Sequence, residues 1–238
     1  MANPARRGPG NATTPLRVRG IEPDEGYLRL RQAILQGRLL PNERLIETEL
    51  AKAFNVGRAA IRTALARLEQ DGLVEREPFR GARVRSISVA EAIEILEARA
   101  VLEGLAIRHA AHNATPAGVA ALRATLARMR VDCDAGDLLR VSEGNSQLHR
   151  QLIDIARHRT AARLIDALQA QNVRYQFRTI LVPGRASQSL EEHRAIVDAV
   201  AAGDPDLAET ATRRHLDRVA DTLRRIPAAQ LDREVALI

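Results

Sequence analysis

The chain has 238 residues, of which 45% are hydrophobic, a composition typical of a globular protein with room for two modest domains. Aromatic residues make up only 2% and Trp is absent, so the core must be built from Leu, Ala, Ile and Val, which favours packed helices. The net charge of +6 lies entirely in the first 88 residues, which hold 16 Lys and Arg against 10 Asp and Glu. A basic N-terminal part beside a neutral remainder indicates that the first part meets a polyanion.

The cellular setting follows from what the sequence lacks. Cys133 is the only cysteine, which excludes a disulfide within the chain and favours a reducing compartment. No apolar run approaches the roughly 20 residues of a membrane-spanning helix. The first residues also lack the apolar segment of a secretion signal. We therefore expect a cytoplasmic protein with no membrane partner.

The N-terminal segment, residues 1–23, is rich in Pro, Gly, Asn and Arg and predicts a flexible arm. Its arginines are candidates for contact with DNA phosphates, although a solvated tail is the simpler interpretation. A first helix is expected from Glu25 to Leu40, and Pro41 and Asn42 should end it.

The next stretch has the pattern of a helix-turn-helix. A short amphipathic helix beginning at Glu47 carries Leu50 and Phe54 on its apolar face. It leads into a turn at residues 55–57, and a second helix follows. The apolar positions of this second helix recur at helical spacing, at Ile61, Leu65 and Leu68. In such motifs the second helix carries the side chains that reach base edges.

Two arginines mark one face of this second helix. Arg58 and Arg62 are four residues apart, so they lie together on its first turns. The planar guanidinium group can bond O6 and N7 of guanine together, and a good pair gives about 1–3 kcal/mol of discrimination. Thr48 on the first helix and Thr63 beside Arg62 are further candidates for DNA contact. The alternative for these residues is an ordinary charged helix face in solvent.

Two short extended runs, VEREP and ARVRSIS, follow the second helix and enclose a turn that contains glycine. They predict a β-hairpin, and its position directly behind the second helix is that of a wing. Arg80 and Gly81 would form the tip of this wing and contact DNA. We place the winged helix-turn-helix domain at residues 24–87.

From residue 88 onward the sequence predicts only helices. Their expected ranges are 89–113, 116–131, 138–157, 161–181, 190–202 and 205–225. The candidate N-caps are Ser88, Thr115, Asp137, Thr160, Ser189 and Asp204. The predicted fold class is therefore mainly α, with a small β-hairpin wing in the first domain and a bundle of six helices at residues 88–228. A C-terminal tail, residues 229–238, completes the chain.

Three histidines lie on apolar stripes of three different predicted helices, at His149, His193 and His215. A buried polar side chain needs a partner, because leaving it unsatisfied costs about 1–3 kcal/mol. Converging imidazoles are suited to a divalent metal. Periodicity alone does not prove convergence, and three separately hydrogen-bonded core histidines remain the alternative.

The basic half resembles a known family. The run GRLLPNERLIETELAKAFNVGRAAIRTALARLEQDGLVEREPFRGARV is similar to the N-terminal domain of the GntR superfamily of bacterial transcription regulators. The resemblance implies that Arg58 and Arg62 read operator guanines and that Gly81 enters the minor groove. Thr48 stands where a third Arg is common, and Gly57 replaces the usual Ser or Thr before the recognition helix.

The helical half resembles the FCD ligand-binding domain. NSQLHRQL, SLEEHRAIVDAVAAGDPDLA and ATRRHLDRV match its order of motifs, which identifies the chain as similar to the FadR subfamily and, with six helices, its VanR-like branch. In many such proteins three His and an Asp hold a divalent metal, commonly zinc, and a carboxylate effector completes the shell. The metal ligands implied here are His149, His193 and His215, with nickel or manganese as other candidate ions. Asn145 stands at the Asp position.

Four residues are candidates for contact with the effector, and the grounds are weaker for Arg174 and Arg178 than for Arg99 and Asn145. Arg99 matches an FCD arginine that meets anionic ligands, although an Arg-Glu pair with Glu103 on the helix surface is the alternative. The other three candidates are Asn145, Arg174 and Arg178.

The leading interpretation is a homodimeric regulator, most simply a repressor, that binds an inverted-repeat operator and is controlled by a small organic acid. A second version keeps the regulator but binds the effector without metal. A third hypothesis, a zinc-dependent enzyme built on the three histidines, is disfavoured because no His-Glu-x-x-His run supplies a general base.

Overall fold

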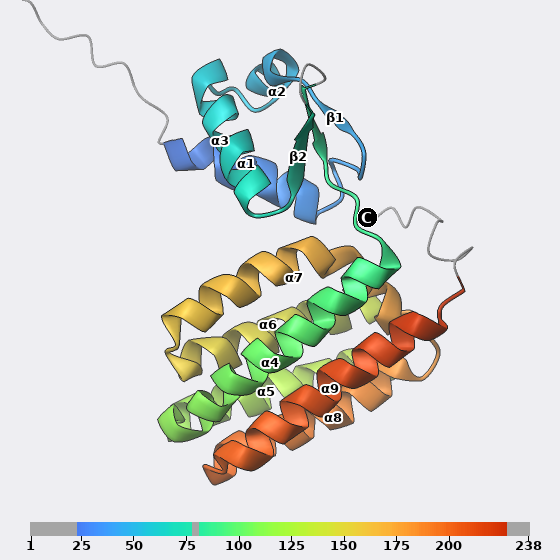
Figure 1. Cartoon of the computed structure of the whole chain (residues 1–238). Coiled ribbons are helices and arrows are strands. Elements are labelled where there is room, and N and C mark those ends of the chain that lie inside the picture. The colour runs from blue at the N-terminus through green and yellow to red at the C-terminus, as the bar shows by residue number, and fades with distance from the viewer. Residues whose placement is uncertain (1–22, 78–80, 228–238) are drawn as a thin grey trace, which may run out of the picture.

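The computed structural model describes residues 23–77 and 81–227. These residues form a small N-terminal domain above a larger helical domain (Figure 1). Residues 1–22 of the predicted arm (1–23), Arg80 at the expected wing tip and the predicted tail lie outside the described residues.

The N-terminal domain is a winged helix-turn-helix. Its helices and strands are α1 (Pro23–Leu35), β1 (Arg44–Leu45), α2 (Glu47–Ala53), α3 (Arg58–Gln70), β2 (Val74–Glu77) and β3 (Gly81–Val84). The three strands are antiparallel in the order β1-β3-β2, and β2 pairs with β3 as the predicted hairpin. Strand β1 was not predicted, because a run of two residues is too short to show alternation.

Helix α1 is shorter than predicted and ends at Leu35 instead of Leu40. Gly37 adopts a left-handed conformation with φ of 72°, which favours glycine. The amides of Gly37 and Arg38 bond back to the carbonyl groups of Ile34 and Ala33, so the chain closes a Schellman motif. The sequence prediction overlooked this stop signal in favour of the later Pro41.

The turn between α2 and α3 is also a Schellman motif with a left-handed residue. Asn55 takes φ of 52°, and the amides of Asn55 and Val56 bond to the carbonyl groups of Lys52 and Ala51. Asn is one of the few residues that tolerate this conformation. The turn therefore reverses the chain within a few residues and sets the angle of α3.

The second domain contains six helices within the described ranges. They are α4 (Val89–Asn113), α5 (Pro116–Asp134), α6 (Leu138–Ala156), α7 (Arg159–Ile180), α8 (Arg185–Ala202) and α9 (Pro205–Arg225). Four predicted N-caps are confirmed, since their side chains accept a backbone hydrogen bond three residues later: Ser88, Thr115, Asp137 and Asp204.

Two predicted N-caps are wrong. Helix α7 is capped by His158, whose Nδ1 accepts from the amide of Ala161, and Thr160 lies inside the helix. Helix α8 begins at Arg185 after Gly184, which takes φ of 77°, so Ser189 lies in its second turn. The prediction at Ser189 rested on the capping-box spacing to Glu192. The helix instead begins five residues earlier, because the left-handed backbone of Gly184 turns the chain there.

Helix α4 packs against four other helices of this domain, α6, α7, α8 and α9, and keeps one face exposed. Its buried Ala and Ile side chains join Leu148, Leu152, Ile196 and Val200 in the main core. The N-terminal domain has its own core, to which α7 contributes Ala170. Within the described ranges, no helix combines the length and apolar composition that crossing a membrane requires.

Candidate functional site

Helix α3 exposes the side chains that were predicted to read DNA. Arg58 is its first residue and Arg62 follows one turn later, and both are exposed. Thr63 is exposed beside Arg62, and Thr48 is exposed on α2. The opposite face of α3 is buried in the N-terminal core through Ile61, Ala64, Leu65 and Leu68. All four candidate readers thus lie on the surface, and their contact with DNA stays a prediction.

Two glycines shape this surface. Gly57 precedes α3 as its N-cap and supplies no side-chain bond to the helix. Gly81 begins β3 with φ of 89°, a conformation that residues with a Cβ rarely adopt, and open space surrounds it. A glycine at the end of the wing is therefore explained by its backbone. The neighbouring Arg80 lies outside the described residues.

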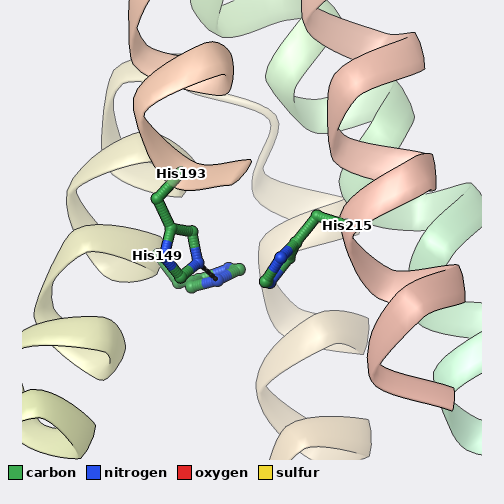
Figure 2. A group of neighbouring side chains, drawn as sticks. All are labelled: His149, His193 and His215. Carbon is green, nitrogen blue, oxygen red and sulfur yellow. Dashed lines mark hydrogen bonds between the residues drawn. The ribbon is translucent and has the colours of Figure 1, made fainter. Parts of the chain in front are cut away.

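The three predicted histidines meet inside the helical domain. His149 comes from α6, His193 from α8 and His215 from α9, and all three are buried. One ring nitrogen of each lies within 4.8 Å of the other two, and Nε2 of His149 is 3.1 Å from Nε2 of His193. Figure 2 shows the ring of His215 facing this pair across a small gap. The predicted convergence is confirmed.

One carboxylate orients His149 from behind. Glu103 of α4 lies 2.9 Å from Nδ1 of His149 and accepts a 2.8 Å bond from Nε of Arg99. Burial acts to raise the pKa of the Glu103 carboxyl, but the charge of Arg99 and the His149 contact outweigh it and lower that pKa to about 2. A charged Glu103 can only accept, so Nδ1 of His149 donates in this contact and its Nε2 faces the other histidines.

A second carboxylate, that of Glu192, orients the ring of His215. Oε2 of Glu192 lies 2.7 Å from Nδ1 of His215 and accepts a 2.9 Å bond from Arg185. Arg218 bonds the other oxygen of Glu192 at 3.2 Å. Each of these two histidines is therefore backed by a Glu that is itself held by Arg.

The remaining histidine has a different environment. Burial lowers the pKa of His193 well below its ordinary value, and the neighbouring His215, His149 and Arg185 lower it further. Burial also lowers the pKa of His215 to about 4, although its bond to Glu192 acts in the opposite direction. Both imidazoles are therefore neutral at neutral pH, the form in which histidine binds metal.

A narrow cavity of about 20 Å³ lies beside the histidines, which is room for roughly one water molecule. Its polar lining includes Arg99, Asn145, Arg185 and His215. Among the described residues, Nη1 of Arg99 and Nη1 of Arg185 are buried atoms without a hydrogen-bond partner. Asn145, one turn before His149, is 6% exposed. Two cationic donors are thus left unsatisfied beside the cluster.

The alternative of a surface pair for Arg99 and Glu103 is wrong, since each residue is only 1% exposed. Sequence reasoning missed Arg185 and the supporting role of Glu192. Arg185 was placed in a loop because α8 was expected to begin at 190. With the helix extended to 185, Arg185 and Glu192 are seven residues apart and share one helix face, which is the signal that predicts their contact.

Arg174 and Arg178 do not line this cavity. They border a separate hollow between the two domains, where Arg174 donates a 3.2 Å bond to the carbonyl of Leu39 in the N-terminal domain. Arg178 lies over the ring of Tyr175, with its guanidinium carbon 6.0 Å from the ring centre. Their predicted role in effector binding has no support from this placement.

Helix α7 joins the cavity to the N-terminal domain and lies next to that domain in Figure 1. Near its C-terminal end, Gln176, Thr179 and Ile180 line the cavity. Earlier on the same helix, Gln171 donates a 2.9 Å bond to the carbonyl of Asp71 at the end of α3. Further contacts with the N-terminal domain come from Arg31–Asp166 at 2.8 Å, Arg85–Gln171 at 3.2 Å and the buried Ala170.

A winged helix-turn-helix joined to an all-helical domain is the architecture of a DNA-binding regulator. Residues 24–84 match the family described as bacterial regulatory proteins, gntR family, and residues 94–218 match the FCD domain. The chain is 32% identical to an uncharacterized HTH-type transcriptional regulator in an unstable DNA locus of Streptomyces ambofaciens, over 85% of either chain. It is 31% identical to a probable D-xylose utilization operon transcriptional repressor of Paenarthrobacter nicotinovorans, over 77% of this chain and 80% of that one.

The fold is also similar to that of E. coli McbR/YncC, with a TM-score of 0.72, 20% identity and coverage of 85% of this chain and 97% of that one. The chain therefore belongs to the GntR family of bacterial regulators and carries an FCD domain. It is a DNA-binding transcription regulator, and the hypothesis of a zinc-dependent enzyme is wrong.

Proposed function

We propose that this regulator is a cytoplasmic homodimer that represses transcription from an inverted-repeat operator until a small carboxylate binds its helical domain. The observation that carries the effector class is the pair of unpartnered Nη1 atoms of Arg99 and Arg185 on the same cavity. A buried donor without a partner is costly, and a carboxylate is the planar acceptor that guanidinium groups match best. Repression is supported by the name of the Paenarthrobacter relative.

We further propose that His149, His193 and His215 hold a divalent metal, with zinc as the best fit. Three imidazoles are a common zinc donor set, and a carboxylate behind a ligating histidine is a usual supporting contact. When bound, the ion would supply a Lewis-acidic centre for the effector carboxylate. No carboxylate belongs to the three-histidine set itself, and Asn145 brings no charge, so an anionic effector would balance the positive charge of the site.

The first test is a thermal-shift screen of small mono- and dicarboxylates, with and without added zinc. A ligand that binds only the folded state stabilises it by about 2.7 kcal/mol at 100 times its Kd, which raises the unfolding midpoint by several degrees. We expect this shift to be largest with zinc present. An equal shift in the presence of a chelator would favour the version without metal.

The matched variants for this screen are Arg185→Lys and Arg194→Lys. Lysine at 185 keeps a cation near Glu192 but lacks the paired nitrogens that a carboxylate needs, so the shift should be lost. Arg194 is an exposed residue of the same helix, and its variant should respond like the wild type. The effector assignment fails if both variants respond equally, or if no carboxylate shifts the wild type.

We propose that α7 transmits binding to the DNA-binding domain. The helix lines the cavity at Thr179 and bonds the end of α3 through Gln171, so a change around the cavity displaces a contact with the recognition helix. We expect Gln171→Ala to keep the effector-induced thermal shift while the effector loses most of its influence on operator affinity. Fluorescence anisotropy with and without effector measures this coupling, and an unchanged response would remove α7 from the pathway.

A further inference from the structure

The guanidinium group of Arg62 is held by a carboxylate of the preceding helix. Nε of Arg62 donates to Oε1 of Glu47 at 3.2 Å, and its Nη2 donates to Oε2 at 3.0 Å. The two groups thus meet side by side, each oxygen facing one nitrogen. Glu47 is the first residue of α2, and Arg62 lies on the second turn of α3.

Neighbouring arginines favour the charged form of Glu47, and one of them also bonds the backbone of Arg62. The bond from Arg62 holds the pKa of the Glu47 carboxyl below its ordinary value, and the charges of Arg58 and Arg76 act in the same direction. Arg76 of β2 also donates a 3.1 Å bond to the carbonyl oxygen of Arg62. The α3 segment that carries Arg62 is therefore bonded to the wing sheet, while its side chain is bonded to α2.

An arginine that reads a guanine must present its fork in one orientation. A free arginine on a DNA-facing surface instead adds to attraction for any phosphate, which strengthens binding to all sequences alike. A carboxylate beside the guanidinium restricts its orientation and offsets its charge. Because the pair is exposed, with side-chain exposure of 63% for Arg62 and 31% for Glu47, the contact contributes little to folding stability.

We propose that Glu47 is a positioning residue for Arg62, which sets how strongly this regulator prefers its operator over other DNA. The inference rests on the proposal that Arg62 reads the operator. Glu47 itself needs no contact with a base. Glu47 orients the guanidinium group of Arg62 toward a base edge. It also offsets the charge of that group, which weakens its attraction to the phosphates of unrelated sequences.

The test compares two carboxylates of one helix. Glu49 is exposed and lies two residues after Glu47, so Glu47→Gln and Glu49→Gln remove the same charge from the same element. The probes are a duplex selected from random DNA by the full-length wild-type protein and a scrambled duplex of equal length and composition. Both variants should bind the scrambled duplex more tightly. Only Glu47→Gln should also lower the ratio of specific to non-specific affinity, on the order of tenfold.

Two further variants keep the outcome decisive. Glu47→Asp retains the charge but is one methylene shorter, so it should also lower the ratio. In the Arg62→Ala background, Glu47→Gln and Glu49→Gln should give the same ratio, because the side chain that Glu47 positions is absent. Equal ratios for Glu47→Gln and Glu49→Gln in the wild-type background would overturn the role of Glu47. If Arg62→Ala leaves specific binding intact, the assignment of Arg62 as a reader fails instead.

Discussion

Replacing His193 with Ala is expected to lower zinc affinity by more than about 100-fold, because changes to residues that merely support a ligand already cost about 10- to 100-fold. His193 is buried beside the other two histidines, with its ring centre 5.2 Å from that of His149 and 4.3 Å from that of His215. Its removal leaves two ligands, which are too few for a tight site. Metal analysis of purified protein, followed by zinc titration against a competing chelator, measures the loss.

The control for this experiment is His112→Ala. His112 is exposed near the end of α4, far in sequence from the cluster, so its variant should bind zinc like the wild type. Equal zinc affinity in the His193 and His112 variants would show that the cluster holds no metal. A wild-type protein that binds no zinc, nickel or manganese leads to the same conclusion, and the histidines would then act on the effector directly.

Replacing Arg58 or Arg62 with Ala is expected to weaken operator binding by about 1–3 kcal/mol each, or roughly 5- to 150-fold, while binding to scrambled DNA falls much less. Both side chains are exposed on the first turns of α3, and base contacts rather than phosphate contacts carry sequence discrimination. Dissociation constants for a selected operator and a scrambled duplex at one salt concentration separate the two effects.

Thr48→Ala provides the comparison within the same surface. Thr48 is exposed on α2, and a threonine offers only one hydroxyl for contact, whereas an arginine offers five N–H donors. We therefore expect Arg58 and Arg62 to account for an unusually large share of specificity. A loss on Thr48→Ala as large as that on Arg62→Ala would contradict this expectation.

The elements that local chemistry determines could be predicted well from the sequence. Ser88, Thr115, Asp137 and Asp204 each cap a helix, and the helices that follow begin where predicted. Two of the failures occur where a glycine with positive φ ends or starts a helix at another residue than predicted. Gly37 ends α1 early, and Gly184 starts α8 early, because a positive φ is not visible in side-chain periodicity.

For the candidate site, too, some features could be predicted from the sequence and others could not. Apolar stripes predicted which faces of three helices turn inward, and His149, His193 and His215 do meet. The residues around them could not be found in this way, because a contact such as Arg185–Glu192–His215 depends on where α8 begins and on how it packs against α9. Periodicity identifies a buried face, whereas hydrogen-bond partners come from tertiary packing.

The contribution of α7 to the core of the winged helix also bears on how freely these domains can be recombined. Ala170 is buried among side chains of the N-terminal domain, and Gln171 and Asp166 bond to that domain on the same helix. The core of the winged helix therefore includes a side chain of the helical domain that lies 86 residues after the last strand, from Val84 to Ala170. A chimaeric regulator that joins this winged helix to a foreign helical domain between β3 and α4 would lack part of the winged helix core. Transferring Asp166, Ala170 and Gln171 of α7 to the foreign domain as well would restore these contacts.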